Sequence, residues 1–169
     1  IMMNHSSFID VFIFPLIPRD AYTGITAVEN FRYPVFSLLI RRLRAIPIER
    51  KNTRLAIKSI EKAERVLKDG IHIGILPEGS RTTSGKMLPL KKGGFHMAIN
   101  TQTSIIPVGV SGAFSFKPKN RWWLRPGLIT IKIGDPIIHE EYESLKIDGL
   151  IGRVESKLKY LSGQNYESR

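Results

Sequence analysis

The chain has 169 residues, a length that suits one folded domain with a sizeable core. It contains no cysteine, which excludes disulfide scaffolds, thiolate metal sites and every mechanism that uses a cysteine nucleophile. The 26 lysines and arginines outnumber the 15 acidic residues, and the net charge is +11. We therefore expect an anionic partner: nucleic acid, an acidic membrane surface or a phosphorylated substrate.

The chain begins at Ile1 rather than at an initiator methionine, so we expect that an N-terminal part of a longer protein precedes it. The longest apolar run, residues 11–18, is too short to span a bilayer. The pattern of a signal peptide is also lacking, because Asp10 interrupts the candidate apolar region. We expect residues 1–169 to form a single domain that does not cross a membrane by itself.

The first two predicted elements are helices with clear boundaries. Residues 31–44 predict a short helix that starts near Pro34 and carries arginines in its last turn, which suits both helix ends. Residues 53–69 predict a longer helix, because apolar and small residues recur along one stripe and Gly70 ends the pattern. The stripe consists of Ala56, Ile60, Ala63 and Leu67.

Strands and helices alternate along the rest of the chain. The patterns predict strands over 72–76, 104–110 and 128–133, and helices over 93–101 and 148–161, the last with Asp148 as its cap. This order predicts an α/β fold: a single domain with a largely parallel or mixed central sheet, flanked by helices. Ligands bind beyond the carboxyl ends of the strands in such sheets.

The segment Asn4-His5-Ser6-Ser7-Phe8-Ile9-Asp10 contains a histidine and an aspartate that could act together. On a straight helix His5 and Asp10 would lie about 140° apart, so they can meet only where the chain turns. Ser7 followed by Asp10 is typical of a helix start, and Asp10 would then point back toward His5. A carboxylate on Nδ1 would leave Nε2 free as a general base. A capped helix preceded by an unrelated histidine gives the same spacing.

The segment Pro77-Glu78-Gly79-Ser80-Arg81 directly follows the first predicted strand. Gly79 would let a ligand approach the backbone, and the guanidinium of Arg81 suits a phosphate or a carboxylate. A turn with a surface ion pair is the alternative. The spacing to the next Gly-Lys pair is one residue too long for a phosphate loop, and Met87 replaces the hydroxyl residue that would bind magnesium, so we exclude an NTPase.

Two other catalytic templates fail. The histidines, at positions 5, 72, 96 and 139, lack metal-ligand spacing, so we expect no metal. Residues 109–113 have a glycine one place too early for the nucleophile elbow of serine hydrolases.

Basic side chains are concentrated in two stretches. Residues 31–70 hold eleven lysines and arginines against four acids, and residues 114–125 pair four cations with four aromatics and no acid. Clustered cations beside tryptophan are typical of a peripheral contact with an anionic membrane. A groove for single-stranded nucleic acid, or a solvated helix face and loop, would have the same composition. For a membrane contact we select Arg41, Arg42, Arg44, Trp122 and Trp123.

The motifs together resemble the glycerolipid acyltransferase family, the group that contains 1-acylglycerol-3-phosphate acyltransferase. Residues 4–10 resemble its NHxxxxD motif, and Ser80 stands where the family usually has threonine. Further blocks follow in the family's order, over a motif-bearing region of about 4–112: residues 46–50, 76–81, 88–95 and 105–108.

The resemblance implies transfer of a fatty acyl group to the free hydroxyl of 1-acylglycerol 3-phosphate, which gives phosphatidic acid. The donor would be acyl-CoA or acyl carrier protein, with no metal and no other cofactor. His5, oriented by Asp10, would be the general base for direct transfer without an acyl-enzyme. The remaining implied residues are Arg50, Glu78, Gly79, Ser80 and Arg81 for the glycerol phosphate, and Ile106 and Pro107 for shaping the pocket of the acyl donor.

The implied partners are the lysophospholipid acceptor, the acyl donor and an anionic membrane surface, at its cytoplasmic face. Nucleic acid is not an expected partner of such an enzyme. Three alternatives remain: a relative that acts on glycerol 3-phosphate, another lysophospholipid or a lyso-aminolipid; a membrane-binding relative without activity; and a basic nucleic-acid-binding module.

Overall fold

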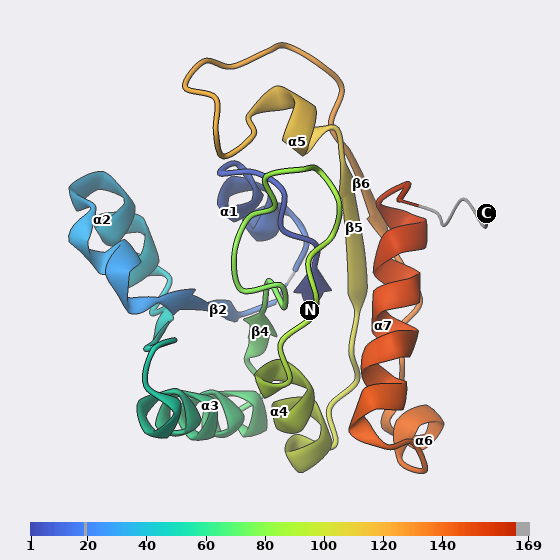
Figure 1. Ribbon diagram of the computed structural model, residues 1–169. Coiled ribbons are helices and arrows are strands. Elements are labelled where there is room, and N and C mark those ends of the chain that lie inside the picture. Colours follow the sequence, from blue (N-terminus) through green and yellow to red (C-terminus); the bar gives the residue numbers. More distant parts are fainter. Residues whose placement is uncertain (19, 165–169) are drawn as a thin grey trace.

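The computed structural model describes residues 1–18 and 20–164, and a mixed β-sheet lies at its centre (Figure 1). Within these residues the strands are β1 (Met2–Met3), β2 (Tyr22–Ala27), β3 (Ile46–Ile48), β4 (His72–Gly74), β5 (Pro107–Ser111) and β6 (Thr130–Ile133). They form two three-stranded sheets, ordered β3-β2-β4 and β1-β5-β6. A parallel bridge between Met2 and Ile75 joins the two, so the strands run in the order β3-β2-β4-β1-β5-β6. Only the β5–β6 pairing is antiparallel among the strand pairs described.

The predicted α/β fold with a largely parallel, mixed sheet is confirmed. The predicted strands over 72–76 and 128–133 contain β4 and β6. The strand predicted over 104–110 begins three residues later as β5, because Ile105 pairs with Ile137 in an isolated bridge instead. The sequence pattern did not indicate β1, β2 or β3, since two or three residues show no period and a glycine interrupts β2.

The helices and their bounds confirm most of the sequence predictions. In the described residues they are α1 (Asp10–Ile13), α2 (Pro34–Arg42), α3 (Thr53–Lys68), α4 (Gly93–Thr101), α5 (Ala113–Phe116), α6 (His139–Tyr142) and α7 (Ile147–Leu161), with 3-10 turns η1 (Phe14–Leu16) and η2 (Val28–Arg32). Asn52 caps α3 by accepting a hydrogen bond from the backbone N–H of Leu55 (3.1 Å).

Two predicted helix boundaries are wrong. Lys146, not Asp148, is the N-cap of α7, and Asp148 lies in the first turn, where its carboxylate pairs with Lys92 (2.8 Å). An anionic side chain is favourable there too, because the helix dipole is positive at its N-terminus. Helix α2 ends at Arg42, so Arg44 lies beyond it, in a left-handed conformation (φ 50°).

Helices cover both faces of the sheet. Consecutive strand residues point to opposite faces: Met2 packs with Phe95 of α4 and Val154 of α7, whereas Met3 packs with Ile13 of α1. Helix α3 joins α4 on the first face, where Ala63 and Met97 share a cluster with strand residues. Figure 1 shows α7 lying along β5, with α3 and α4 at the opposite end of the sheet from α1.

Two strand glycines allow helices to approach the sheet closely. A Cβ at Gly109 of β5 would lie 2.3 Å from the backbone carbon of Leu161 in α7, and one at Gly74 of β4 would lie 2.0 Å from the ring of Phe14. Neither atom could be accommodated without displacement of a neighbour. Glycine therefore sets the distance between the sheet and the segments on both faces.

Three adjacent strands, β4, β1 and β5, carry the loops in which the sequence motifs lie. Because these strands are parallel, their carboxyl ends share one edge of the sheet. His5 follows β1, Glu78 and Arg81 follow β4, and Gly112 follows β5. The fold thus brings segments that are far apart in sequence to one place. None of the helices in the described residues is both long and apolar enough to span a bilayer.

Replacing Gly109 with alanine should destabilise the protein, because the new methyl group would collide with the backbone of α7. We expect the free energy of unfolding, measured by urea denaturation, to fall by about 2 kcal/mol or more. The control is Gly152→Ala in α7, where nothing lies within 4 Å of the added Cβ; it should raise stability by about 0.5–1 kcal/mol through helix propensity. Equal effects of the two changes would contradict this account of the packing.

Candidate active site

His5 and Asp10 form a close pair at the end of β1. Nδ1 of His5 lies 2.9 Å from Oδ2 of Asp10, and their side chains are 14% and 0% exposed. The same oxygen accepts hydrogen bonds from the backbone N–H groups of Ser6 (2.7 Å) and Ser7 (2.8 Å), so α1 starts with the carboxylate turned back as predicted. A carboxylate can only accept, so the proton of a neutral imidazole lies on Nδ1. Nε2 then has its lone pair free, and no hydrogen bond to it occurs in the described part of the chain.

Asn4 and Ser7 anchor this loop, a role that the sequence analysis did not assign. The side-chain amide of Asn4 donates to the carbonyl of Val110 (3.0 Å) and accepts from its N–H (2.7 Å), which extends the β1–β5 ladder by one rung. The hydroxyl of Ser7 donates to the carbonyl of Lys117 (2.7 Å). The sequence carries no local signal for this role of Asn4, because the two-residue strand β1 before it shows no period.

The segment after β4 lies beside His5. The backbone N–H of His5 donates to Oε1 of Glu78 (2.6 Å), and the N–H of Thr82 donates to the carbonyl of His5 (3.2 Å). Gly79 has a φ of 74°, which favours glycine in this turn. Arg81 is half-buried and Ser80 is exposed.

Glu78 is a buried carboxyl group with both oxygens engaged. Its side chain accepts from His5 through Oε1 and from the N–H of Leu88 through Oε2 (2.6 Å), and the residue is 2% exposed. Burial raises the pKa of Glu78 from 4.5 to about 7, with a smaller contribution from the carboxylate of Asp10, while the two backbone N–H groups act in the opposite direction. No lysine or arginine in the described ranges forms an ion pair with it.

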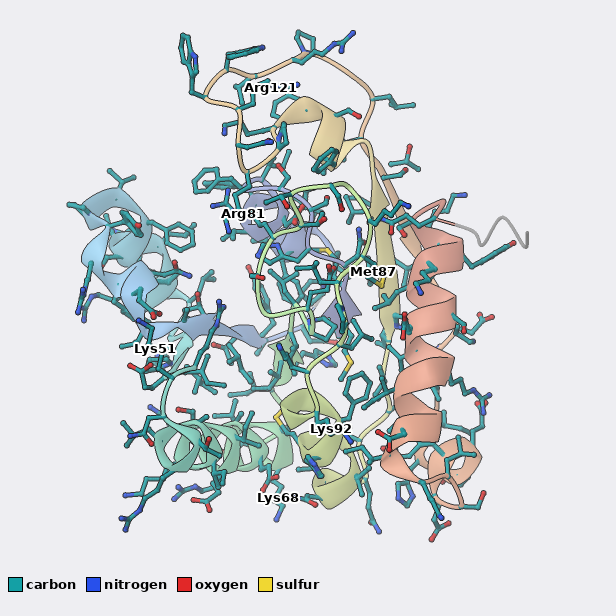
Figure 2. All side chains as sticks on the ribbon, viewed as in Figure 1. Lys51, Lys68, Arg81, Met87, Lys92 and Arg121 are labelled. Carbon is teal, nitrogen blue, oxygen red and sulfur yellow. The ribbon has the colours of Figure 1, made fainter. Side chains whose placement is uncertain are left out.

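Arg50 is not placed beside the other residues that we assigned to the glycerol phosphate. It lies exposed after β3, on the far side of β2 from β4 and β1. At about 4.8 Å per strand, the end of β3 is about 14 Å from the end of β1. Figure 2 accordingly shows Lys51, the neighbour of Arg50, well away from Arg81.

Ile106 and Pro107 lie within the sheet rather than at its carboxyl edge. Pro107 is the first residue of β5 and pairs with Met2, and the carbonyl of Ile106 accepts a hydrogen bond from the N–H of Met2 (2.9 Å). Neither residue lines the apolar groove described below. Pro107 is buried and Ile106 is partly buried, and their role in shaping the pocket of the acyl donor stays a prediction.

An apolar groove of about 90 Å³ reaches Asp10 of the His–Asp pair. Its lining includes Asp10 and Phe14, Phe36 and Ile40 of α2, and Gly24 of β2. The groove would suit a hydrocarbon chain, because apolar surface gains free energy when it leaves water.

The residues selected for a membrane contact lie on two exposed segments, α2 with the residues after it and the loop after α5. Arg41 and Arg42 are exposed in the last turn of α2, with Arg44 just after it. Trp122 and Trp123 are 86% and 53% exposed in the loop after α5, where the guanidinium of Arg121 lies 5.7 Å from the ring centre of Trp123. Figure 1 shows this loop above α1 and α2 to the left of α1.

Two further exposed aromatic side chains lie in α1 and just before it, and the sequence analysis did not identify them. Phe8 and Phe12 are about half exposed and stack edge to face, with ring centres 5.5 Å apart. Phe8 also contacts Phe36 of α2 (6.1 Å), so the apolar surface is continuous from α1 to α2.

Histidine, aspartate and glutamate side chains do not form a group of three or more that could hold a metal ion in residues 1–18 and 20–164. The ionisable groups that the structure brings to the site are the imidazole of His5, the buried carboxyl groups of Asp10 and Glu78, and the guanidinium of Arg81.

An α/β sheet with a His–Asp pair beyond its parallel strands defines a domain with a candidate general base. Residues 1–111 match the family model described as Acyltransferase, and the chain belongs to this family. The resemblance to glycerolipid acyltransferases that the motifs indicate is confirmed.

Individual relatives agree with this assignment. The chain is 35% identical to a 1-acyl-sn-glycerol-3-phosphate acyltransferase of Cocos nucifera, over 89% of this chain and 49% of that protein. For the enzyme of the same name from Limnanthes douglasii the identity is 32%, over 89% and 54%. The crystal structure of the 1-acyl-sn-glycerophosphate acyltransferase PlsC from Thermotoga maritima has a TM-score of 0.82 and 27% identity, over 96% of this chain and 64% of that one. The chain spans about half the length of these curated relatives.

The stability of the protein should depend on pH through Glu78. Its pKa is higher in the folded chain (about 7) than its ordinary value of 4.5, so the folded state binds a proton more tightly between these values. The contribution of this group to the free energy of unfolding should therefore fall, by about 3 kcal/mol, as the pH rises from 4.5 to 7. Urea denaturation of the wild type and of Glu78→Gln at pH 5 and pH 8 measures this contribution. Between these pH values the free energy of unfolding of the wild type should fall relative to that of the variant. An unchanged difference between the two proteins, or a relative rise for the wild type, would contradict the prediction.

Proposed function

We propose that the protein transfers an acyl group from a thioester to the free hydroxyl of 1-acylglycerol 3-phosphate, which gives phosphatidic acid. His5 accepts the hydroxyl proton on Nε2 as the hydroxyl oxygen attacks the thioester carbon. The tetrahedral intermediate then breaks its carbon–sulfur bond, and the leaving thiolate takes the proton back from His5. No acyl-enzyme forms, and Asp10 stabilises the imidazolium between the two proton transfers.

The observation that carries the proposal is the His5–Asp10 pair, whose Nε2 is the free nitrogen at the edge of the sheet. The guanidinium of Arg81 provides a cation for the phosphate of the acceptor on a segment that is hydrogen-bonded to His5. The apolar groove that reaches Asp10 suits an acyl chain. Family membership and the names of the relatives support the reaction and the acceptor.

Replacing His5 with alanine should lower acyl transfer by about 100-fold or more, because a general base typically contributes at least this factor. The assay follows release of free thiol from acyl-CoA with lysophosphatidic acid in liposomes. His96→Ala is the control, since His96 lies exposed on α4 and should not affect turnover. Turnover that survives His5→Ala would contradict the mechanism.

The same assay distinguishes donors and acceptors. Acyl carrier protein replaces CoA in one series, and glycerol 3-phosphate, a second lysophospholipid and a lyso-aminolipid replace lysophosphatidic acid in another. A preference for one of these acceptors would identify a related acyltransferase. Absence of turnover with every combination would contradict an acyltransferase function.

We also propose that the protein contacts an anionic membrane, at its cytoplasmic face, through α2 and the loop after α5. The support is that three arginines, Arg41, Arg42 and Arg44, are exposed at the end of α2 or just after it, and that Trp122 and Trp123 are exposed in the loop after α5. Tryptophan suits the interface between lipid and water, and the cytoplasmic leaflet carries negative charge. A lipid acceptor would reach the groove from this surface.

The variant Arg41→Gln/Arg42→Gln should bind more weakly to vesicles that contain phosphatidylserine, by about tenfold or more, since each cation contributes about 1 kcal/mol. Sedimentation with the vesicles measures binding, and added salt should reduce the difference in binding between the wild type and the variant. The charge-matched control, Lys58→Gln/Lys62→Gln, alters exposed cations of α3 away from this surface. Equal losses for the two double variants would mean that only net charge matters, which contradicts the proposed surface.

A further inference from the structure

We infer that Glu78 is a positioning residue for the backbone of His5, and not a ligand of the acceptor. The inference rests on the proposed function, because it assigns the part that Glu78 has in the action of His5 as a base. It also replaces the role in glycerol-phosphate binding that the sequence motif implies for Glu78.

The geometry leaves Glu78 little capacity to bind a substrate. Its two carboxyl oxygens are each 2.6 Å from a backbone nitrogen, those of His5 and Leu88, and the residue is 2% exposed. A phosphate ester is also anionic and would be repelled by a carboxylate. Arg81, half-buried on the same segment, is the group whose charge suits the phosphate.

Hydrogen bonds fix the position of the backbone of His5 and of its ring. Its N–H is held by Glu78 and its carbonyl by the N–H of Thr82 (3.2 Å), while Asp10 holds the imidazole ring (2.9 Å). A side chain with its backbone and ring both fixed has little freedom left, so the direction of Nε2 is set. A general base needs this, because its distance to the hydroxyl proton must be that of a hydrogen bond.

The second oxygen of Glu78 holds the loop that carries Arg81, the residue proposed to bind the phosphate of the acyl acceptor. Leu88 lies ten residues beyond Glu78, so one carboxylate closes the loop 78–88, on which Arg81 lies. Gln164 closes the same loop from outside: its side chain accepts from the N–H of Met87 (2.8 Å) and donates to the carbonyl of Gly85 (3.0 Å). Glu78 differs from Gln164 in that it also contacts His5.

Keeping a carboxyl group at this position is costly. Burial and the neighbouring Asp10 raise the pKa of Glu78 to about 7, and no cation pairs with it among the described residues. The ionised carboxylate of Glu78 can accept hydrogen bonds from both N–H groups, whereas the neutral amide of Glu78→Gln would present an NH2 group to one of them. The buried carboxyl group of Glu78 therefore lowers the stability of the fold, but it fixes the distance between His5 and the loop 78–88.

The test compares Glu78→Gln with Gln164→Ala, which loosens the same loop without touching His5. We expect Glu78→Gln to lower kcat by about tenfold or more and to change the KM for lysophosphatidic acid by less than about threefold. Gln164→Ala should leave kcat within about twofold of the wild type. A raised KM with unchanged kcat in Glu78→Gln would make Glu78 an acceptor ligand and overturn the inference.

Amide hydrogen exchange provides a measurement that does not need activity. In Glu78→Gln the amides of His5 and Leu88 should exchange at least about tenfold faster, while that of Val110 in β5 keeps its rate. If Glu78→Gln does not fold, Glu78→Asp replaces it: the charge remains, but the shorter side chain cannot span both N–H groups, and kcat should again fall more than KM rises. Unchanged exchange at His5 would overturn the inference. Absence of turnover in the wild type would instead be a failure of the proposed function.

Discussion

The carboxylate of Asp10 is the group on which the geometry of the site depends. One oxygen accepts three hydrogen bonds, from the imidazole of His5 and the N–H groups of Ser6 and Ser7, in a position with no exposure to solvent. A buried charge is costly unless such bonds compensate for it. The chain therefore has to turn between His5 and Asp10 so that the backbone of the turn faces the carboxylate. The start of α1 and the orientation of the imidazole follow from the same requirement.

The parallel order of β4, β1 and β5 supplies the rest of the site. Adjacent parallel strands present their carboxyl ends at one edge, so three loops meet there without a long connection between them. Asn4 extends the β1–β5 pairing through its side chain, and Thr82 and Glu78 extend the contact between the loops after β4 and β1. The edge of the sheet is thus continued by hydrogen bonds beyond its last regular rung, and the loop that carries His5 is held from both sides.

Local patterns predicted the local features. The stripe from Ala56 to Leu67 predicted α3 because its period repeats over several turns, and the spacing of Ser7 and Asp10 predicted the turned-back carboxylate because all of its partners lie within five residues. The bond between His5 and Glu78 spans 73 positions, and nothing in either segment indicates it. The distance of Arg50 from His5 depends on the strand order, which places β2 and β4 between their strands. Short strands such as β1 have no period from which that order could be predicted.

Within the part of the chain that the structure describes, the buried carboxyl groups of the site are bound by backbone groups and not by the chain's many cations. The chain has 26 lysines and arginines, yet backbone N–H groups, and not cations, surround the buried carboxyl groups of Asp10 and Glu78 in the described residues. A lysine at these positions would satisfy the carboxylates, but it would also add a mobile positive charge beside the imidazole and disfavour its protonated form. Backbone N–H groups bind Oδ2 of Asp10 and both oxygens of Glu78 without this effect, because they are fixed and neutral, whereas Oδ1 of Asp10 is buried without a hydrogen-bond partner in the described residues. In the proposed mechanism Asp10 stabilises the imidazolium, and Arg81 keeps its charge for the phosphate of the acceptor.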